Sequence, residues 1–287
     1  MGSTTRRGFD CTRHMRYGNR IAGLTATTQS RFPMAWNPGQ YLAFAGPRMQ
    51  PAVDLLARIA LEAPRSVVDL GCGPGNITPL LRARWGDAAI VGLDNSAAML
   101  ERARAANPTE SYENTDIGAW NPAQRHAVIY TNAALQWLPD HESLLPRLAG
   151  YVAPGGVLAM QIPRIYEAPS HRLILDAIRE GPWRDKLEPV WATIATQGPA
   201  YYRRLMAPLA RTLDIWETEY LQILDGDNPV ADYTKGTWLT RFLDPLDEPW
   251  RGALEALYRN KIRAAYPPEP DGKTLFAFRR LFMIATF

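Results

Sequence analysis

The sequence predicts an α/β protein with a doubly wound, mostly parallel sheet of seven strands and a helical cap formed by late insertions. Three observations lead to this fold class. Between residues 51 and 163, short apolar runs alternate with segments of helical periodicity, as in βαβ units with right-handed crossovers. The first apolar run opens into a loop with glycine at every second position. After residue 163 the chain is helical or irregular, and it is rich in Trp, Tyr and Pro.

Seven segments have the composition of strands, and five of them come before residue 164. The two later segments are longer, and the first of these alternates at Ile215, Glu217 and Glu219. The predicted strands are SVVDL (66–70), AAIVGLD (88–94), SYENTD (111–116), HAVIYTN (126–132), VLAMQIP (157–163), TLDIWETEYLQIL (212–224) and LFAFRRLFMIATF (275–287).

Apolar residues at helical spacing predict a helix before the first strand and helices between the strands. Ser96 and Asp140 have the position and chemistry of N-caps. The last helix of this series is expected to stop at the Pro-Gly-Gly sequence of residues 154–156. The predicted helices are 51–64, 77–85, 96–107 and 141–152.

The segment before residue 34 differs in composition from the rest of the chain. Residues 1–33 hold six arginines and one aspartate, are rich in Ser and Thr, and lack hydrophobic periodicity. We interpret them as a disordered extension, or as a start codon assigned too far upstream with Met34 as the true start; a transit peptide is the alternative. Residues 34–287 are expected to form a single domain, with cap helices from about 164–210 and 229–265.

Composition restricts the partners of this protein. With 46% hydrophobic and 21% charged residues, it has the composition of a globular protein, and no apolar run approaches the ~20 residues of a membrane span. Without the six arginines and one aspartate of the extension, 26 of 32 basic and 28 of 29 acidic residues remain, so the net charge changes from +3 to −2. A mildly acidic domain does not favour nucleic acid. Two cysteines are too few for a disulfide framework, and no cluster has metal-ligand spacing. We expect a cytoplasmic protein without membrane, nucleic-acid or metal partners.

The loop after the first strand, VVDLGCGPGN, predicts a site for a nucleotide-like ligand. The strand reaches Asp69 and passes through Gly71, Gly73 and Gly75 into a helix, and glycine lets a ligand approach the backbone without a Cβ in the way. The spacing differs from the G-x-G-x-x-G of dinucleotide sites, and no Gly-Lys-Ser/Thr follows as in a P-loop. An acid at position 69 would repel a pyrophosphate and suits a cationic ligand.

Polar residues end the next three strands. Asp94 ends the second strand and can accept hydrogen bonds from both hydroxyls of a ribose. Asp116 ends the third and can accept from an adenine amino group, and Asn132 ends the fourth. Ligands of open parallel sheets bind outside the carboxyl ends of the strands, so these residues are expected to converge on one crevice.

The loop VDLGCGPGN, followed by acids at the ends of the second and third strands, resembles the class I S-adenosylmethionine-dependent methyltransferases. The resemblance implies a Rossmann-like fold and S-adenosyl-L-methionine as the cofactor. It also implies that the loop glycines face the methionine part of the cofactor, Asp94 the ribose and Asp116 the adenine. A loop that binds NAD, or no ligand, is the alternative.

Longer motifs from Met34 to the C-terminus narrow the resemblance. They resemble the trans-aconitate 2-methyltransferase family, which implies that the protein forms a monomethyl ester of a small tricarboxylate. The run NAALQWLPDH also lacks the Asn/Asp-Pro-Pro-aromatic pattern usual in methyltransferases acting on nucleic-acid amines. The motifs are MAWNPGQYLAF (34–44), PAVDLLARI (51–59), NAALQWLPDH (132–141), GGVLAMQIP (155–163) and LFAFRRLF (275–282).

A polycarboxylate in a mostly closed pocket needs forked hydrogen-bond donors. Arg164, Arg241 and Arg280 are the candidate substrate ligands, and Arg48 is a candidate ligand for a carboxylate of the cofactor or of the substrate. A solvated arginine or a structural ion pair is the alternative for each. The chain departs from the family pattern near these positions, for example at Trp238, where glycine is expected.

Aromatic and amide residues are candidates for closing and positioning. Trp36 and Tyr41 lie in a segment that can cover the cofactor, and Gln136 and Trp137 follow the fourth strand, where they can border the methyl group. Packing is the alternative for each aromatic residue. No general base is assigned, because a carboxylate, with an ordinary pKa near ~4, is already a nucleophile and His141 reads as a helix-start residue.

Three other functions fit parts of the pattern. The first is a carboxyl methyltransferase for a different small-molecule or carrier-bound acid, although an acidic domain offers little docking surface for a carrier. The second is a non-catalytic protein that binds S-adenosylmethionine. The third is a dehydrogenase, which NADH would stabilise where S-adenosylhomocysteine would not.

Overall fold

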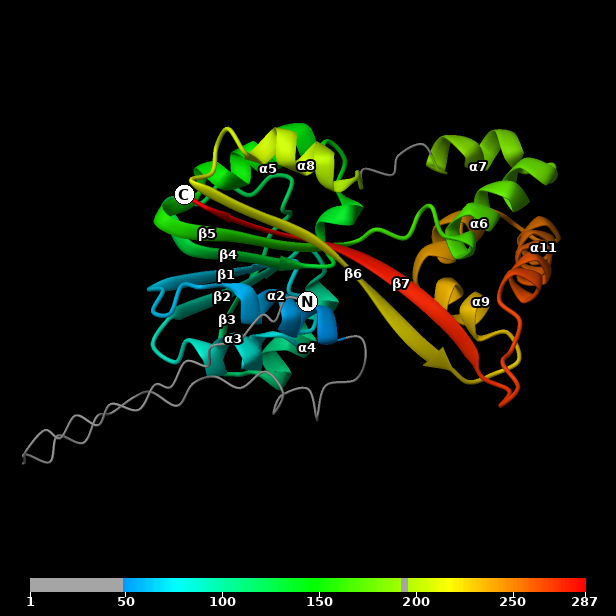
Figure 1. Cartoon of the computed structure of the whole chain (residues 1–287), viewed down its shortest axis with the longest axis horizontal. Coiled ribbons are helices and arrows are strands. Elements are labelled where there is room, and N and C mark those ends of the chain that lie inside the picture. Colours follow the sequence, from blue (N-terminus) through cyan, green and yellow to red (C-terminus); the bar gives the residue numbers. More distant parts are fainter. Residues whose placement is uncertain (1–48, 192–195) are drawn as a thin grey trace, which may run out of the picture. The chain divides into compact units, whose positions relative to one another are not determined.

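The computed structural model describes residues 49–191 and 196–287. Its centre is one seven-stranded sheet with the order β3-β2-β1-β4-β5-β7-β6 (Figure 1). The five strands from β3 to β5 in this order are parallel to one another, and β7 is antiparallel to both β5 and β6. The predicted fold class is confirmed. The strands are β1 (Ser66–Leu70), β2 (Ala89–Asp94), β3 (Ser111–Asn114), β4 (His126–Asn132), β5 (Val152–Pro163), β6 (Thr212–Leu224) and β7 (Thr274–Thr286).

Helices cover both faces of the sheet, because side chains of alternate parity on each strand are buried on opposite sides. On one face Tyr130 and Phe282 pack with the apolar residues of α2 (Gln50–Arg58) and α3 (Thr78–Arg84). On the other face Met160 packs with α5 (His141–Gly150) and α8 (Pro199–Met206). A smaller cluster joins α4 (Ala97–Ala106) to β3, and the predicted N-cap Ser96 accepts a hydrogen bond from the backbone N–H of Met99.

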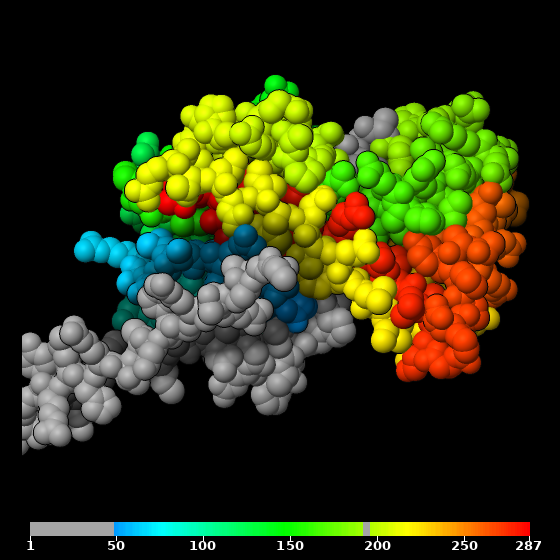
Figure 2. Space-filling model, viewed as in Figure 1, coloured from blue at the N-terminus to red at the C-terminus, as the bar shows by residue number. Residues whose placement is uncertain are grey.

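The cap is built around a third apolar cluster. The N-terminal half of β7 contributes Phe276 and Phe278 to this cluster. Figure 1 shows β6 and β7 running without interruption from the sheet to the cap helices. In Figure 2 the yellow atoms of the β6 region lie on the visible face, in agreement with its place at the edge of the sheet. The cap elements are α6 (Pro169–Glu180), α7 (Arg184–Trp191), α9 (Pro229–Thr234), the π-helix η2 (Lys235–Leu239), α10 (Thr240–Leu243) and α11 (Trp250–Ala265). None of the described helices combines the length and the apolar character needed to cross a bilayer.

The largest differences between predicted and observed boundaries are at the start of β5 and the end of α2. β5 begins at Val152, so the Pro-Gly-Gly sequence expected to separate helix from strand lies inside the strand. The strand continues there because Gly155 N donates to Phe287 O (2.8 Å) and Phe287 N donates to Gly156 O (3.1 Å). The helix α2 ends at Arg58, before the expected end near residue 64.

Candidate active site

The glycine loop forms one wall of a cleft at the carboxyl ends of the strands. Gly71 and Gly73 have φ values of +74° and +55°, which disfavour residues with a side chain. A Cβ at Gly71 would lie 2.2 Å from Ala134 Cβ, so only glycine lets the loop pack against the segment after β4. A Cβ at Gly73 would meet nothing within 4 Å, so the backbone there is open to a ligand. Gly75 also has a positive φ, of +76°.

The cleft has a volume of about 440 Å³. Its lining includes five residues that the sequence analysis selected, Gly71, Gly73, Asp94, Asp116 and Trp137. It also includes residues that the sequence did not predict, among them Asn95, Met99, Thr115 and Ile117. Position in the sequence could have indicated Asn95 and Thr115, because each is adjacent to one of the predicted acids.

Asp94 is held in place by the loop that it faces. One carboxylate oxygen accepts a hydrogen bond from Gly73 N (2.9 Å), and the other accepts from Ser96 N (2.9 Å). Each oxygen can accept a second hydrogen bond, so the carboxylate is oriented and still able to bind two hydroxyls. Asp116 lies two residues beyond the end of β3 and accepts from Gly118 N (2.7 Å).

Asp69 is buried beneath the loop, with 1% of its surface exposed. Its Oδ2 atom has no hydrogen-bond partner in the described part of the chain. Burial, and then the negative charge of Asp94, raise the pKa of Asp69 to about 7. A cationic ligand group near this carboxylate would oppose both effects.

The short turn η1 (Leu135–Trp137) carries Gln136 and Trp137, and Trp137 lies in the lining of the cleft. Gln136 is buried, and its Nε2 donates to Ala133 O (2.6 Å) while its Oε1 has no partner in the described residues. The side chain of Trp137 is 52% exposed, and its ring centroid lies 5.1 Å from that of Trp238 in the cap. This exposure disfavours simple core packing for Trp137.

His141 is hydrogen-bonded to the turn η1 and is not placed to act as a base. Its Nδ1 lies 2.8 Å from Tyr202 Oη, and its Nε2 lies 2.9 Å from Leu135 O. Because a carbonyl only accepts, Nε2 carries the proton, and Tyr202 Oη donates to Nδ1 while accepting from Gln197 N (3.1 Å). Burial lowers the pKa of His141, which favours this neutral form.

The three predicted substrate arginines have different surroundings. Arg164 already pairs with Glu217 (3.0 Å) and Glu167 (3.3 Å). Arg241 lies in α10, with its guanidinium carbon 5.3 Å from the centroid of the Trp238 ring. Arg280 is 8% exposed, and within the described residues its Nη1 donates a hydrogen bond to Gln161 Oε1 (3.3 Å).

Asn132 lies at the carboxyl end of β4, opposite Gln161 of β5, and its Oδ1 is buried without a partner in the described residues. Trp36, Tyr41 and Arg48 lie outside the residues that the structure describes, as does the extension of residues 1–33. The roles given to all of these residues stay predictions.

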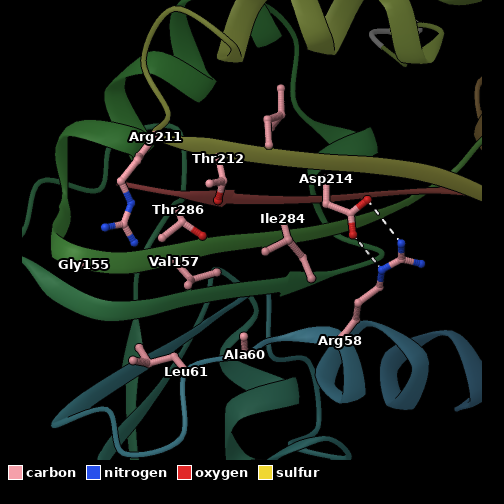
Figure 3. Close-up of a pocket in the computed structure, with 11 residues that line it drawn as sticks. Arg58, Ala60, Leu61, Gly155, Val157, Arg211, Thr212, Asp214, Ile284 and Thr286 are labelled. Atoms are coloured by element: carbon pink, nitrogen blue, oxygen red, sulfur yellow. Dashed lines mark hydrogen bonds and ion pairs between the residues drawn. The ribbon is translucent and has the colours of Figure 1, made fainter.

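A second cavity, of about 490 Å³, lies at the opposite end of the strands from the glycine loop (Figure 3). It is formed where β5 and β6 begin and β7 ends, with Gly155, Thr212 and Thr286 in its lining. Arg58 on its wall is neutralised by Asp214, with Nε and Oδ2 2.6 Å apart. Because of its position at the other end of the strands, this cavity is separated from the glycine loop by the length of the strands.

Comparison with known proteins agrees with this geometry. Residues 41–204 match a family model described as a methyltransferase domain. The chain is 47% identical over 250 residues to the trans-aconitate 2-methyltransferase of Azoarcus sp. strain BH72, covering 87% of this chain and 98% of that protein. It is 46% identical over 253 residues to the enzyme of that name from Methylobacterium radiotolerans, covering 87% and 97%.

Solved structures show the same fold at lower sequence similarity. The BH2331 protein of Bacillus halodurans superposes with a TM-score of 0.55 at 13% identity, covering 83% of this chain and 98% of that one. The YcgJ protein of Bacillus subtilis superposes with a TM-score of 0.52 at 12% identity, covering 82% and 96%. From the sequence matches and this shared fold together, the chain belongs to the trans-aconitate 2-methyltransferase family of the class I methyltransferases.

Proposed function

We propose that this protein transfers a methyl group from S-adenosyl-L-methionine to one carboxylate of trans-aconitate. The near full-length similarity to proteins of that name supports the reaction. The observation that carries the choice of an anionic substrate is the buried guanidinium of Arg280, which forms no ion pair within residues 49–191 and 196–287. A buried cation without a counter-charge is costly, so the site favours an acid that supplies one.

The residues around the cleft fit the cofactor. The open backbone at Gly73 leaves room for the methionine part, and Oδ2 of Asp69, which has no partner in the described residues, suits a nearby cation. The fixed carboxylate of Asp94 would hold the ribose hydroxyls, and Asp116 would accept from the adenine. The bound cofactor would supply a methyl group activated by a sulfonium.

Catalysis by this chain would rest on positioning and on the exclusion of water. An acceptor carboxylate is ionised at neutral pH, so no residue has to remove a proton from it. Trp137, in the lining of the cleft, and the adjacent Gln136 would border the transfer path, and Arg280 would fix the acid. The two buried ring nitrogens of His141 are both engaged, in agreement with a mechanism without a general base.

Mass spectrometry of purified protein tests this proposal. The protein would be incubated with S-adenosylmethionine and, in parallel, with trans-aconitate, cis-aconitate, citrate or isocitrate. We expect a monomethyl ester of trans-aconitate at low substrate concentration, together with S-adenosylhomocysteine. No ester from any of the four acids would contradict the proposal. Thermal shifts with S-adenosylhomocysteine and with NADH would then separate a silent cofactor-binding protein from a dehydrogenase.

A further inference from the structure

Four polar side chains form a diagonal row on one face of the sheet. Register places Asp69 of β1 opposite Tyr130, two residues before Asn132 of β4. Asn132 lies opposite Gln161 of β5, and Gln161 lies opposite Phe282 of β7, two residues along the chain from Arg280. Paired residues and residues two apart share a face, so all four side chains leave the same side of adjacent strands. The row thus leads from the glycine loop to the predicted substrate arginine.

Each member of the row has a buried polar atom without a hydrogen-bond partner in the described residues. The two members nearest the loop leave acceptors, Asp69 Oδ2 and Asn132 Oδ1. The other two leave donors, Gln161 Nε2 and Arg280 Nε. Native proteins rarely bury unpaired polar groups, and here four occur side by side with their chemistry divided into acceptors and donors.

Gln161 and Arg280 are already coupled to each other. Gln161 is fully buried, and its Oε1 accepts from Arg280 Nη1 (3.3 Å). This contact uses the acceptor of the amide, so the amide nitrogen and the rest of the guanidinium remain as donors. The guanidinium carbon also lies 4.6 Å from the centroid of the Phe278 ring, which limits where the guanidinium can move. The pair is therefore a preoriented group of donors with a net positive charge.

We propose that Gln161 and Arg280 form one carboxylate subsite, in which the amide holds the guanidinium and both side chains donate to the same carboxylate of the acid substrate. This inference rests on the proposed function and adds Gln161 as a specificity-determining residue. The carboxylate held here is one that is not methylated, because forked donors would withdraw charge from a nucleophile. Gln161 lies on the strand next to β4, and the residues that follow β4 line the cleft. Since neighbouring strands are about 5 Å apart, an acid held by this subsite would place a second carboxylate on the side of the cleft.

The Gln161→Glu variant tests the subsite. Its new carboxylate would pair with Arg280 and occupy the position of the substrate carboxylate, while the donor Nε2 is lost. We expect KM for trans-aconitate to rise about 10- to 100-fold, the loss expected for a charge-assisted hydrogen bond, with kcat at saturation changed less than about threefold. Affinity for S-adenosylhomocysteine should stay within about twofold, and the melting temperature should not fall, because the buried guanidinium gains a counter-charge.

Two further variants complete the experiment. Arg280→Gln should raise KM for the acid in the same way. The double variant Gln161→Glu/Arg280→Gln should have a KM no higher than that of the single variant with the higher KM, because both substitutions act on one subsite. Gln222→Glu introduces the same change on β6, opposite Phe276, and should leave KM for the acid unchanged. Unchanged KM in Gln161→Glu, or additive losses in the double variant, would overturn the subsite.

A binding measurement separates this inference from the proposed function. Trans-aconitate should raise the melting temperature of the wild-type protein saturated with S-adenosylhomocysteine, and it should not raise that of Gln161→Glu. Wild-type protein that shows this shift without forming an ester would contradict the proposed function alone. Equal shifts in the two proteins would overturn the subsite alone, and no shift in the wild type with no ester formed would overturn both.

Discussion

At the scale of single residues, the cleft beside the glycine loop depends on acids whose surroundings differ. Asp94 receives two backbone hydrogen bonds, whereas Asp69, buried below it, has an oxygen without a partner in the described residues. The first carboxylate is oriented by the folded chain, and the second is held in an environment that disfavours its charge. The two acids therefore predict different consequences of mutation.

Replacement of Asp94 by alanine should weaken cofactor binding. The variant Asp94→Ala loses the acceptors for the ribose hydroxyls, and we expect the binding free energy of S-adenosylmethionine to fall by roughly 1–3 kcal/mol. Isothermal titration calorimetry measures this change, with Asp87→Ala, an exposed acid in the loop before β2, as the control. Unchanged affinity would remove the ribose assignment.

Replacement of Asp69 by asparagine should stabilise the protein without ligand and weaken cofactor binding. The folded-state pKa, about 7, lies above the ordinary value of 3.8, so the folded state loses stability as pH rises from about 4 to 7. At pH 8 this loss is complete, and Asp69→Asn should increase the free energy of unfolding by up to about 4 kcal/mol. Urea unfolding at pH 8 measures the gain in stability. A cofactor affinity reduced at least about tenfold would show that the unfavourable burial of the Asp69 charge serves cofactor binding.

Residue-scale chemistry was predictable only where it is local in sequence. The glycine loop and the acids at positions 69 and 94 are visible in one short stretch of chain around each strand end. Gln161 was missed because its role depends on the pairing of β5 with β7, which come from residues more than 100 apart. The pairing of Arg164 with Glu217 has the same long-range origin.

At the scale of elements, the turn η1 depends on two buried side chains from other helices. Tyr202 of α8 donates to His141 of α5, which donates to the carbonyl of Leu135 in the turn. The same hydroxyl accepts from Gln197 N, so one oxygen connects three segments. The wall of the cleft that carries Trp137 is positioned by this chain of hydrogen bonds.

Removal of that hydroxyl should destabilise the protein. Tyr202→Phe leaves His141 Nδ1 and the N–H of Gln197 without partners, and we expect the free energy of unfolding to fall by about 1–3 kcal/mol. Tyr201→Phe is the matched control, because no hydrogen bond of the Tyr201 hydroxyl is present within the described residues. Urea unfolding of both variants measures the difference, and equal losses would contradict a structural role for this network.

Element boundaries were predictable to the extent that local residues decide them. The N-caps Ser96 and Asp140 were predicted correctly, because each side chain accepts from a backbone N–H three residues later. The predicted start of β5 was wrong. Hydrogen bonds to Phe287, the last residue of the chain, extend the strand through a Pro-Gly-Gly sequence that usually interrupts regular structure. The helix α8, within the range expected to cap the sheet, contributes Tyr202 and Met206 to the core of the sheet.

At the scale of the whole molecule, buried histidines set the response to acid. Burial lowers the pKa of His171 to about 3, and it also lowers the pKa values of His126 and His141. Below pH ~6.5 the unfolded chain therefore binds more protons than the folded one, and stability is lost as pH falls. Asp69 acts in the opposite direction between about pH 7 and 4 and offsets the contribution of one histidine.

Stability should consequently fall between pH 6.5 and 4. His171 alone contributes a slope approaching about 1.4 kcal/mol per pH unit, and Asp69 opposes it with a slope of similar size, so the lowered pKa values of His126 and His141 decide the net direction. Urea unfolding at pH 7, 6 and 5 measures the slope. The Asp69→Asn variant should lose stability more steeply than the wild type, and a flat or rising profile in acid would contradict the assignment.

The unbroken β6–β7 ribbon has a mechanical consequence. Its two strands are hydrogen-bonded over 13 residue pairs, from the sheet into the cap, and Arg280 lies within it. A hinge motion between sheet and cap would have to bend the β6–β7 pair and break some of its interstrand hydrogen bonds. Twisting of the pair would leave these hydrogen bonds intact. Under the proposed function the acid would be bound by a residue of this stiff ribbon, and we expect exchange of substrate and product to depend on movement of other segments around the site.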